Sequence, residues 1–234
     1  MFTSIDIETT EICNRRCSYC PNSTHYHTRR EGGPRQLPPA TLKRIISQLV
    51  ELDYCGRVDL NLYGEPLGDS RIISTAAVIS ETLPGAQIVI YTNGDRLDIE
   101  MAGNLDAIRN LSVIITDHSE YEPNDLRMLA AAHGFKYRKF SSETGVLHNR
   151  CGLVDHPLAK GRAKVCFPKA SPNMYINARG EAQLCCNDYL AEVTYGNVLD
   201  RSLMEIWNDP VYAGHRAALP TPGLDICRRC NCNA

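Results

Sequence analysis

The sequence predicts an α/β fold, a parallel sheet built from βα units with a small cysteine-rich domain after it. Between residue 3 and about residue 140, apolar runs of strand length alternate with segments of helical period, as in repeated βα units around a parallel sheet. Around residues 159–169 the alternation stops, Lys, Gly and Pro become frequent, and a short cysteine-rich stretch follows. We therefore expect one domain over residues 1–158 and a second over residues 159–234.

Five strands and three helices are predicted in the first domain. The strands are the apolar runs at residues 3–9, 57–62, 87–91, 111–116 and 136–140. One helix is expected over residues 39–52, where apolar residues recur at helical spacing after a proline start. Two more are expected over residues 71–81 and 124–133, the second ending before Gly134.

A hairpin and a short helix are predicted in the second domain. Residues 174–176 and 182–184 flank the turn-rich segment Asn177-Ala178-Arg179-Gly180, which is typical of a connector that closes a β-hairpin. Residues 203–207 are expected to form a helix that begins after Ser202.

Composition and charge exclude several classes of protein. The 234 residues, 43% of them hydrophobic, can bury a substantial core. The 25 Lys and Arg residues nearly balance 27 Asp and Glu residues, so we expect no nucleic-acid partner. The sequence has no apolar run of about 18 residues and no basic-then-apolar start, so we expect a cytoplasmic protein with no membrane partner.

Eleven cysteines point to metal-sulfur chemistry. An odd count without an export signal argues against a disulfide framework and favours ligation. Cys13, Cys17 and Cys20 form a CxxxCxxC motif after the first predicted strand. A loop can wrap three thiolates around a four-iron cluster and leave one iron open to a ligand. A zinc site completed by His25 or His27 is the alternative, but this spacing is unusual for zinc.

The triad, with Tyr19 before its last cysteine, resembles the signature of the radical S-adenosylmethionine (SAM) superfamily. The segment Tyr63-Gly64-Glu65-Pro66 resembles the glycine-glycine-glutamate element with which that family holds the SAM ammonium, although Tyr63 replaces the first glycine. The resemblance implies a partial parallel (βα)6-type barrel and a SAM-binding [4Fe-4S] cluster. It also implies a flavodoxin- or ferredoxin-type reductant and cleavage of SAM to a 5′-deoxyadenosyl radical.

The resemblance also implies which residues contact SAM. Polar residues follow two further strands and match by position the family's ribose and methionine contacts. In a parallel barrel the strand ends together form one pocket, although such residues also occur in ordinary turns. The implied SAM-binding set is Tyr19, Gly64, Glu65, Pro66, Thr92, Asn93, Asp117 and His118.

The late cysteines resemble the Twitch form of the SPASM auxiliary-cluster domain. Gly180 precedes Cys185 by five positions and permits a tight turn with φ > 0. The resemblance implies one closed auxiliary [4Fe-4S] cluster, suited to electron transfer or structure, with the ligands Cys166, Cys185, Cys227 and Cys230. Cys186 and Cys232 are surplus and could replace their neighbours, and a zinc ribbon is the alternative.

Within the superfamily, motifs along most of the chain resemble the 2-deoxy-scyllo-inosamine dehydrogenases of aminoglycoside antibiotic biosynthesis. The motifs are residues 13–23, 63–67, 91–95, 149–150, 196–198 and 206–207. The resemblance implies oxidation of an alcohol on a small polyhydroxylated substrate such as a sugar, cyclitol or nucleoside. It also implies substrate contacts from Tyr63, Tyr91, Arg150 and Asn187, with Tyr63 and Arg150 catalytic. Asn187 stands where those relatives carry a glutamate, and Cys186 where they carry a phenylalanine.

Four other activities stay open. Cys151 stands where the relatives have glycine, and its thiol could act catalytically as the hydrogen donor of an epimerase. Sulfur insertion from the auxiliary cluster and peptide modification are further possibilities, although the triad begins at residue 13 and leaves no room for an amino-terminal peptide-recognition domain. An electron carrier is the non-enzymatic alternative, and a carrier would not cleave SAM. For Cys55 we expect no role.

Overall fold

The computed structural model describes residues 1–25, 32–118, 124–140, 147–159, 166, 172–219 and 223–231. The alternative zinc ligand His27 and the surplus Cys232 lie outside these residues. Among the described residues, no helix has the length and apolar character needed to cross a membrane.

The described strands form one eight-stranded sheet, in the order β5-β4-β3-β2-β1-β6-β7-β8. Strands β5 to β6 in this order are parallel, whereas β7 and β8 are antiparallel to their neighbours. The parallel α/β prediction is confirmed, and so is the hairpin. The strands are β1 (Ser4–Ile7), β2 (Arg57–Asp59), β3 (Gln87–Thr92), β4 (Leu111–Asp117), β5 (Lys136–Lys139), β6 (Asn173–Ile176), β7 (Glu181–Gln183) and β8 (Thr194–Asn197).

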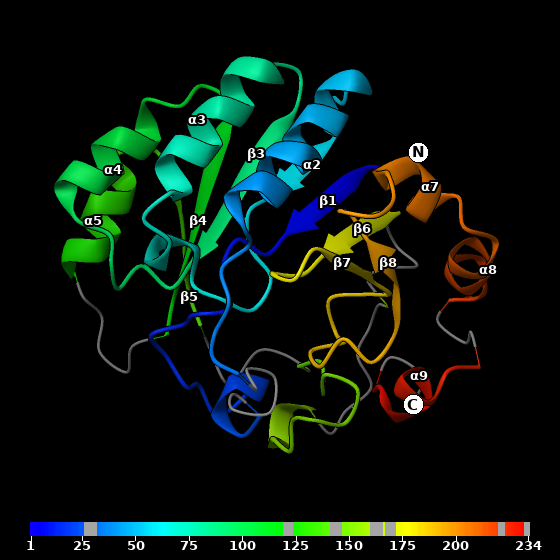
Figure 1. Cartoon of the computed structure of the whole chain (residues 1–234). Helices are drawn as coiled ribbons and strands as arrows, with labels where there is room; N and C mark the ends of the chain where they lie inside the picture. The colour runs from blue at the N-terminus through cyan, green and yellow to red at the C-terminus, as the bar shows by residue number, and fades with distance from the viewer. Residues whose placement is uncertain are drawn as a thin grey trace.

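The helices of the first half stand together on one side of the sheet (Figure 1). They are α2 (Pro39–Glu51), α3 (Ile72–Thr82), α4 (Ile99–Asp106) and α5 (Asn124–Ala132). Helices α7 (Leu203–Trp207), α8 (Pro210–Ala218) and α9 (Asp225–Arg229) follow the hairpin, and short 3₁₀ turns form η1 (Pro21–Ser23), η2 (Pro66–Gly68) and η3 (Pro157–Ala159). A capping box at Ser202 and Glu205 opens α7 at the predicted place.

Helix α2 packs against the sheet through its apolar side chains. The apolar stripe of α2, with Ile45 and Leu49 fully buried, belongs to the same hydrophobic cluster as Ile5 and Ile7 of β1. Burying such side chains is the main favourable term in folding. The loops after the strands, including residues 8–25, gather at the lower edge of the molecule in Figure 1.

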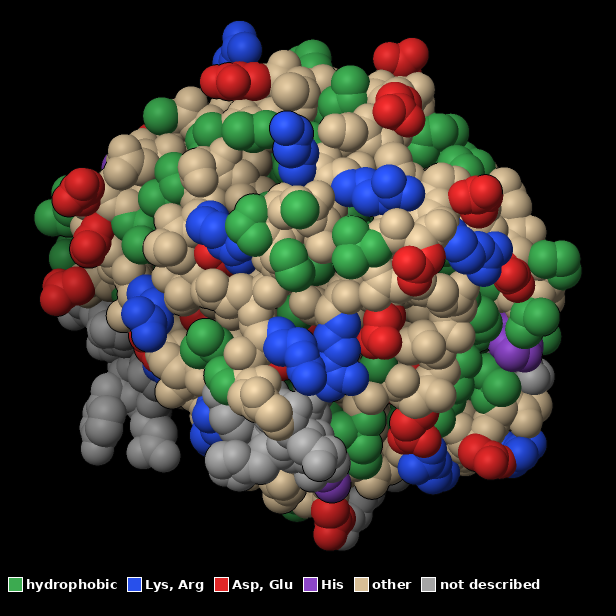
Figure 2. Space-filling view, in the orientation of Figure 1, with side chains coloured by type: hydrophobic (Ala, Val, Ile, Leu, Met, Phe, Trp, Pro, Cys, Tyr) green, Lys and Arg blue, Asp and Glu red, His purple; other side chains and the backbone are tan. Residues whose placement is uncertain are grey.

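The sheet continues across the predicted domain boundary. Strand β6 lies beside β1 in parallel register from Ser4↔Asn173 to Ile7↔Ile176, so the cysteine-rich half extends the same sheet. The division at residues 158 and 159 stays a prediction. On the face shown in Figure 2, acidic and basic side chains are interspersed with apolar ones.

Candidate functional site

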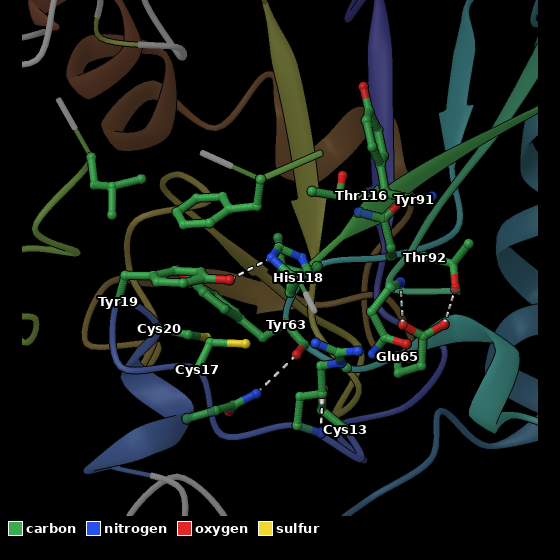
Figure 3. A pocket seen from close by; sticks show the side chains of 18 of the residues that line it. Cys13, Cys17, Tyr19, Cys20, Tyr63, Glu65, Tyr91, Thr92, Thr116 and His118 are labelled. Carbon is green, nitrogen blue, oxygen red and sulfur yellow. Dashed lines mark hydrogen bonds between the residues drawn. The ribbon is translucent and has the colours of Figure 1, made fainter. Parts of the chain in front are cut away.

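A cavity of about 600 Å³ lies at the carboxyl ends of the parallel strands. It brings together twelve of the predicted site residues, namely Cys13, Cys17, Tyr19, Cys20, Tyr63, Gly64, Glu65, Tyr91, Thr92, Asn93, His118 and Arg150. Figure 3 shows the three cysteines of the triad on the loop after β1, facing the strand-end residues. The volume is in the range of ordinary small-molecule sites.

The cysteine triad lines one wall of this cavity. The Cys20 amide donates to the Cys17 carbonyl oxygen over 2.9 Å, which closes a turn between two of the thiols. The Cys13 sulfur accepts a hydrogen bond of 3.4 Å from the Arg15 amide, and burial raises the pKa of the Cys13 thiol. No three His, Cys, Asp or Glu side chains of the described residues converge closely enough to hold a single metal ion. Three thiols spread over one wall fit the predicted four-iron cluster.

Glu65 is held rigidly at the cavity. The side chain is 4% exposed, and its carboxylate accepts from the Thr92 hydroxyl (2.6 Å), the Asn93 amide (2.9 Å) and the Leu67 amide (3.1 Å). Burial raises the pKa of Glu65, and these hydrogen bonds oppose that shift. A fixed carboxylate here suits an ammonium group.

The backbone at Gly64 explains why the motif needs a glycine. A Cβ atom at this position would lie 1.8 Å from the Thr10 carbonyl oxygen. The next amide, that of Glu65, donates to the Ile12 carbonyl oxygen over 2.8 Å. The motif therefore packs directly against the loop that carries the cysteines.

Tyr19 joins the cysteine loop to the strand-end residues. Its ring stacks on Phe140 with 4.1 Å between centroids, and its hydroxyl is hydrogen-bonded to Nδ1 of His118. Desolvation, together with the charge of Arg15, lowers the pKa of His118 to about 4. His118 is consequently neutral at physiological pH.

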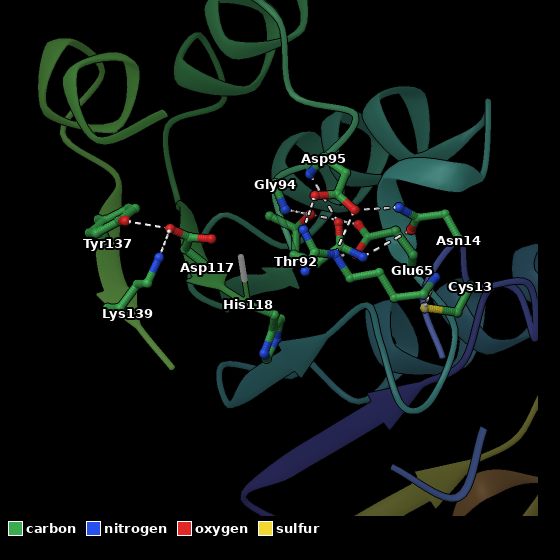
Figure 4. A network of polar contacts seen from close by, with 12 residues as sticks. Cys13, Asn14, Glu65, Thr92, Gly94, Asp95, Asp117, His118, Tyr137 and Lys139 are labelled. Atoms are coloured by element: carbon green, nitrogen blue, oxygen red, sulfur yellow. Dashed lines mark hydrogen bonds and ion pairs between the residues drawn. The ribbon is translucent and has the colours of Figure 1, made fainter. Parts of the chain in front are cut away.

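A polar brace fixes the cysteine loop to the end of β3 (Figure 4). The Asp95 carboxylate accepts hydrogen bonds from Nε of Arg15 (2.6 Å) and from the side-chain Nδ2 of Asn14 (2.6 Å). Asn14 in turn accepts from the Asn93 side chain over 2.9 Å. The brace positions the cysteines relative to the residues implied to bind SAM.

Two predicted SAM contacts do not line the cavity. Asp117 is buried, and its carboxylate accepts from Tyr137 (2.7 Å) and Lys139 (3.0 Å), as Figure 4 shows. Pro66 is buried in η2 behind Glu65. Their contact with SAM stays a prediction.

Arg150 and Tyr63 line the cavity together. The Arg150 guanidinium lies over the Tyr63 ring, 5.4 Å from its centroid. It donates to the Cys186 carbonyl oxygen (3.2 Å) and to Oδ1 of Asn187 (2.9 Å). The Tyr63 hydroxyl donates to the same Cys186 carbonyl. Asn187 is thus brought next to the cavity, although it acts on Arg150 and does not itself line the wall.

Tyr91 borders the cavity between two arginines. Its hydroxyl accepts from Nη2 of Arg57 over 2.7 Å, and the guanidinium of Arg138 lies 5.6 Å from its ring centroid. Tyr91 therefore lines the cavity, while its hydroxyl is hydrogen-bonded to Arg57.

Cys185, one of the late cysteines, lies near Arg150. Cys185, Cys227 and Cys230 are buried and Cys166 is partly exposed, and none of the four forms a disulfide. The side chain of Cys151 hydrogen-bonds to Cys230, and that bond, with burial, raises the pKa of Cys151. Cys151 is 3% exposed and is not among the residues that line the cavity. The thiol faces the predicted auxiliary cluster.

The sequence did not single out several cavity residues. Arg15 and Asn22 lie within or just after the cysteine motif. Most of the others lie in the last residues of the predicted strands at 57–62 and 136–140, where the local pattern does not set them apart from ordinary strand residues. The residues missed are Arg15, Asn22, Asn61, Leu62, Arg138, Lys139, Phe140, Leu147 and His148.

Family models match both halves of the chain. Residues 7–136 match the Radical SAM superfamily, and residues 166–231 match SPASM, an iron-sulfur cluster-binding domain. A curated relative from Niallia circulans, the S-adenosyl-L-methionine-dependent 2-deoxy-scyllo-inosamine dehydrogenase, is 29% identical over 237 residues, which cover 99% of this chain and 93% of the relative.

Two solved structures also match this chain over most of its length. BtrN in complex with AdoMet and 2-DOIA matches with a TM-score of 0.82 and 27% identity, over 99% of this chain and 93% of that one. Streptococcus suis SuiB bound to the precursor peptide SuiA matches with a TM-score of 0.70 over 93% of this chain and 67% of that one. At 15% identity, the second likeness concerns the fold alone.

Proposed function

The chain belongs to the radical SAM superfamily, and we propose that it oxidises a secondary alcohol on a small polyhydroxylated ring in natural-product biosynthesis. The observation that carries the proposal is one cavity that combines the cysteine triad and Glu65 with Tyr63 and Arg150. The likeness to a 2-deoxy-scyllo-inosamine dehydrogenase along nearly the whole chain supports the reaction class.

The described residues fit the cofactors. Cys13, Cys17 and Cys20 would hold the first cluster, and Glu65 would receive the SAM ammonium, with Thr92, Asn93 and His118 around the remainder. The set Cys166, Cys185, Cys227 and Cys230 would hold the auxiliary cluster. When bound, SAM and the two clusters would supply the radical that removes hydrogen and the acceptor for the electron left behind.

Arg150 and Tyr63 would orient the reacting alcohol. Arg150 is fixed by two hydrogen bonds and by the Tyr63 ring, so its fork presents donors in a constant direction. The carbinol carbon loses a hydrogen atom, and the hydroxyl then loses a proton as one electron leaves, which yields the ketone. The main contribution of these protein residues to the reaction would be to position that carbon correctly.

Inversion of a stereocentre is the second candidate, because Cys151 is a thiol near Arg150. Its hydrogen bond to Cys230 and its absence from the cavity wall favour oxidation over inversion. We further propose that a flavodoxin- or ferredoxin-type protein in the cytoplasm supplies the initial electron.

The test is anaerobic reconstitution with iron, sulfide, SAM, a reductant and candidate polyols. Mass spectrometry should detect 5′-deoxyadenosine together with a ring product that has lost two hydrogen atoms. A ring product of unchanged mass would support inversion, and a product that has gained sulfur would support insertion. Failure to cleave SAM with every ring would contradict the proposal.

A further inference from the structure

Asn187 connects the cavity to the cysteines of the proposed auxiliary cluster. Its side chain is 2% exposed. It is hydrogen-bonded to Arg150 and His148, which line the cavity, and to the sulfur of Cys230. A buried amide has to satisfy its donors and its acceptor with nearby groups, so these three partners indicate what Asn187 does.

The orientation of the Asn187 amide follows from its partners. An arginine can only donate, so the amide oxygen must be the atom that accepts from Arg150, at 2.9 Å. The amide nitrogen then donates to Nδ1 of His148 at 3.1 Å and to the sulfur of Cys230 at 3.9 Å. A flipped amide would place its oxygen against that sulfur. Arg150 therefore holds the amide with a donor toward Cys230.

A second side chain is hydrogen-bonded to the same sulfur. The thiol of Cys151, a residue that is 3% exposed, bonds to Cys230. Arg150 and Cys151 are consecutive and both have left-handed backbone, which directs the guanidinium toward Tyr63 and the thiol toward Cys230. Cys151 and Asn187 thus converge on one sulfur from two distant segments of the chain.

The sulfur of Cys185 has donors from the backbone. The amides of Asn187 and Asp188 are hydrogen-bonded to it. A cysteine that ligates iron is a thiolate, and a thiolate can only accept. With the auxiliary cluster in place, the segment after Cys185 therefore supplies donors to two ligating sulfurs, and Cys151 supplies another to Cys230.

Hydrogen bonds to the ligating sulfurs affect the potential at which an iron-sulfur cluster accepts an electron. Reduction adds negative charge to the sulfurs, so a donor stabilises the reduced form more than the oxidised form and raises the potential. The effect is stronger in a buried site than at an exposed one, because the local dielectric constant is low. Substitution cannot remove the backbone donors to Cys185, but it can remove the side-chain donors to Cys230.

We propose that Asn187 and Cys151 are positioning residues that raise the reduction potential of the auxiliary cluster by donating hydrogen bonds to Cys230. This inference rests on the proposed function, which makes Cys230 a ligand of that cluster and the cluster the acceptor of the electron left by the alcohol. Asn187 then has two roles, because it also holds Arg150. One amide connects the arginine that orients the alcohol with the cluster that accepts the electron.

Redox titration of the reconstituted protein with SAM, followed by electron paramagnetic resonance, measures the potential. SAM changes the signal of the cluster that it binds, which separates that signal from the auxiliary one. Cys151→Ala and Asn187→Leu each remove a donor without adding charge. Each should favour the oxidised auxiliary cluster about tenfold, which for one electron equals a fall in potential of about 59 mV.

Cys151→Ser is the matched variant, because its hydroxyl keeps a donor at the same place. It should retain the potential of the unchanged protein. If Cys151 only filled space, Cys151→Ser and Cys151→Ala would give the same potential. Cys55→Ala removes an exposed cysteine outside both proposed ligand sets and should change nothing. Iron analysis accompanies each titration, and each variant should retain about eight irons.

Three results would overturn the proposal. They are an unchanged potential in Cys151→Ala, an unchanged potential in Asn187→Leu of full iron content, and equal potentials in Cys151→Ala and Cys151→Ser. Loss of iron from Cys151→Ala would overturn it as well, since Cys151 would then be a ligand. If Asn187→Leu fails to assemble the auxiliary cluster, the two Cys151 variants decide.

The titration uses no ring substrate, which separates this inference from the proposed reaction. If the potentials fall as expected but no ring is dehydrogenated, the proposed reaction fails while the assignment of Asn187 and Cys151 stands. If a ring is oxidised while the potentials of the variants are unchanged, the assignment fails and the proposed reaction stands.

Discussion

At position 64 the structure has no room for any residue larger than glycine. The Cα of Gly64 faces the Thr10 carbonyl, and any side chain would overlap that oxygen. The same backbone joins Glu65 to Ile12 through a hydrogen bond. A larger residue must therefore separate the cysteine loop from the carboxylate proposed to bind SAM.

We predict that Gly64→Ala abolishes SAM binding and destabilises the protein by about 3 kcal/mol or more. Calorimetric SAM titration and urea unfolding measure the two effects. The matched control is Gly103→Ala in α4, where the added methyl would have no described atom within 4 Å apart from its chain neighbours and the backbone of its own helix. The control should stabilise the protein by about 0.5–1 kcal/mol. Normal SAM binding by Gly64→Ala would show that the close contact is not needed.

Arg150 and Cys151 are consecutive non-glycine residues with left-handed backbone, at φ 48° and φ 55°. This conformation costs roughly 1–2 kcal/mol for each such residue. The turn directs the two side chains differently, Arg150 toward Tyr63 and Cys151 toward Cys230. The strain is thus concentrated where the cavity meets the auxiliary cysteines.

We predict that Cys151→Ala retains alcohol oxidation, since the thiol is not on the cavity wall. The rate of ketone formation should stay within about threefold of the unchanged protein, because a side chain off the wall contributes little to binding of the transition state. Mass spectrometry of the ring product provides the measurement. A variant that cleaves SAM but returns no ketone would make the thiol catalytic.

At the level of elements, every predicted strand and helix of the first half is present, because buried strands and the stripe of α2 leave strong periodic patterns. Helix α4 escaped prediction since it has eight residues and buries only Ala102 and Leu105. Helix α8 likewise buries only Tyr212. Short helices with little apolar surface give weak patterns.

The residues of the candidate site likewise fall into two groups, those that the sequence predicts and those that it does not. The cysteine triad and Glu65 were predictable because each belongs to a local motif. Arg138 and His148 were not, since they reach the cavity only through the folding of β5 and the segment after it. Asn187 was predicted as a substrate contact, but its role toward Arg150 depends on a hydrogen bond between distant segments.

The junction of η2 and α3 supplies a stability prediction. Arg71 donates to Asp69 and to the carbonyl oxygens of Leu37 and Thr9, so it connects this junction to the loop after β1. Desolvation acts to raise the pKa of Asp69, but hydrogen bonds from Arg71 outweigh it and the net pKa is lowered. A carboxyl group with a lowered folded pKa stabilises the fold above its unfolded pKa.

We predict that Asp69→Asn costs roughly 1.5–3 kcal/mol of unfolding free energy at neutral pH. The difference should fade as the pH falls from about 4, the pKa of an aspartate in the unfolded chain, through the lowered folded pKa, below which Asp69 is protonated in both the folded and the unfolded state. Urea unfolding at a series of pH values is the measurement. A difference that stays constant down to pH 3 would mean that the charge of Asp69 is not involved.

For the whole molecule, two separate sets of thiols on one sheet imply two clusters. The triad lies on the loop after β1, whereas the other set consists of Cys166 before β6 and Cys185, Cys227 and Cys230 after β7. About eight irons per chain are expected. The sheet joins the two halves through β1 and β6, but the two sets come from separate segments of the chain, so we expect each cluster to form without the other.

We predict that replacing Cys13, Cys17 and Cys20 together by alanine halves the iron content and leaves a cluster spectrum. Iron analysis and visible absorption of the reconstituted variant measure this. Complete loss of iron would mean that the auxiliary set depends on the triad, and full retention would place the first cluster elsewhere.

Isotope transfer tests hydrogen abstraction from an alcohol carbon most directly. A ring substrate deuterated at the carbinol carbon is incubated anaerobically with the reconstituted enzyme, SAM and reductant. We expect 5′-deoxyadenosine that carries the deuterium, in amounts matching a ketone product that has lost it. Unlabelled 5′-deoxyadenosine, or a ring product that exchanges its deuterium for solvent hydrogen without forming a ketone, would contradict it.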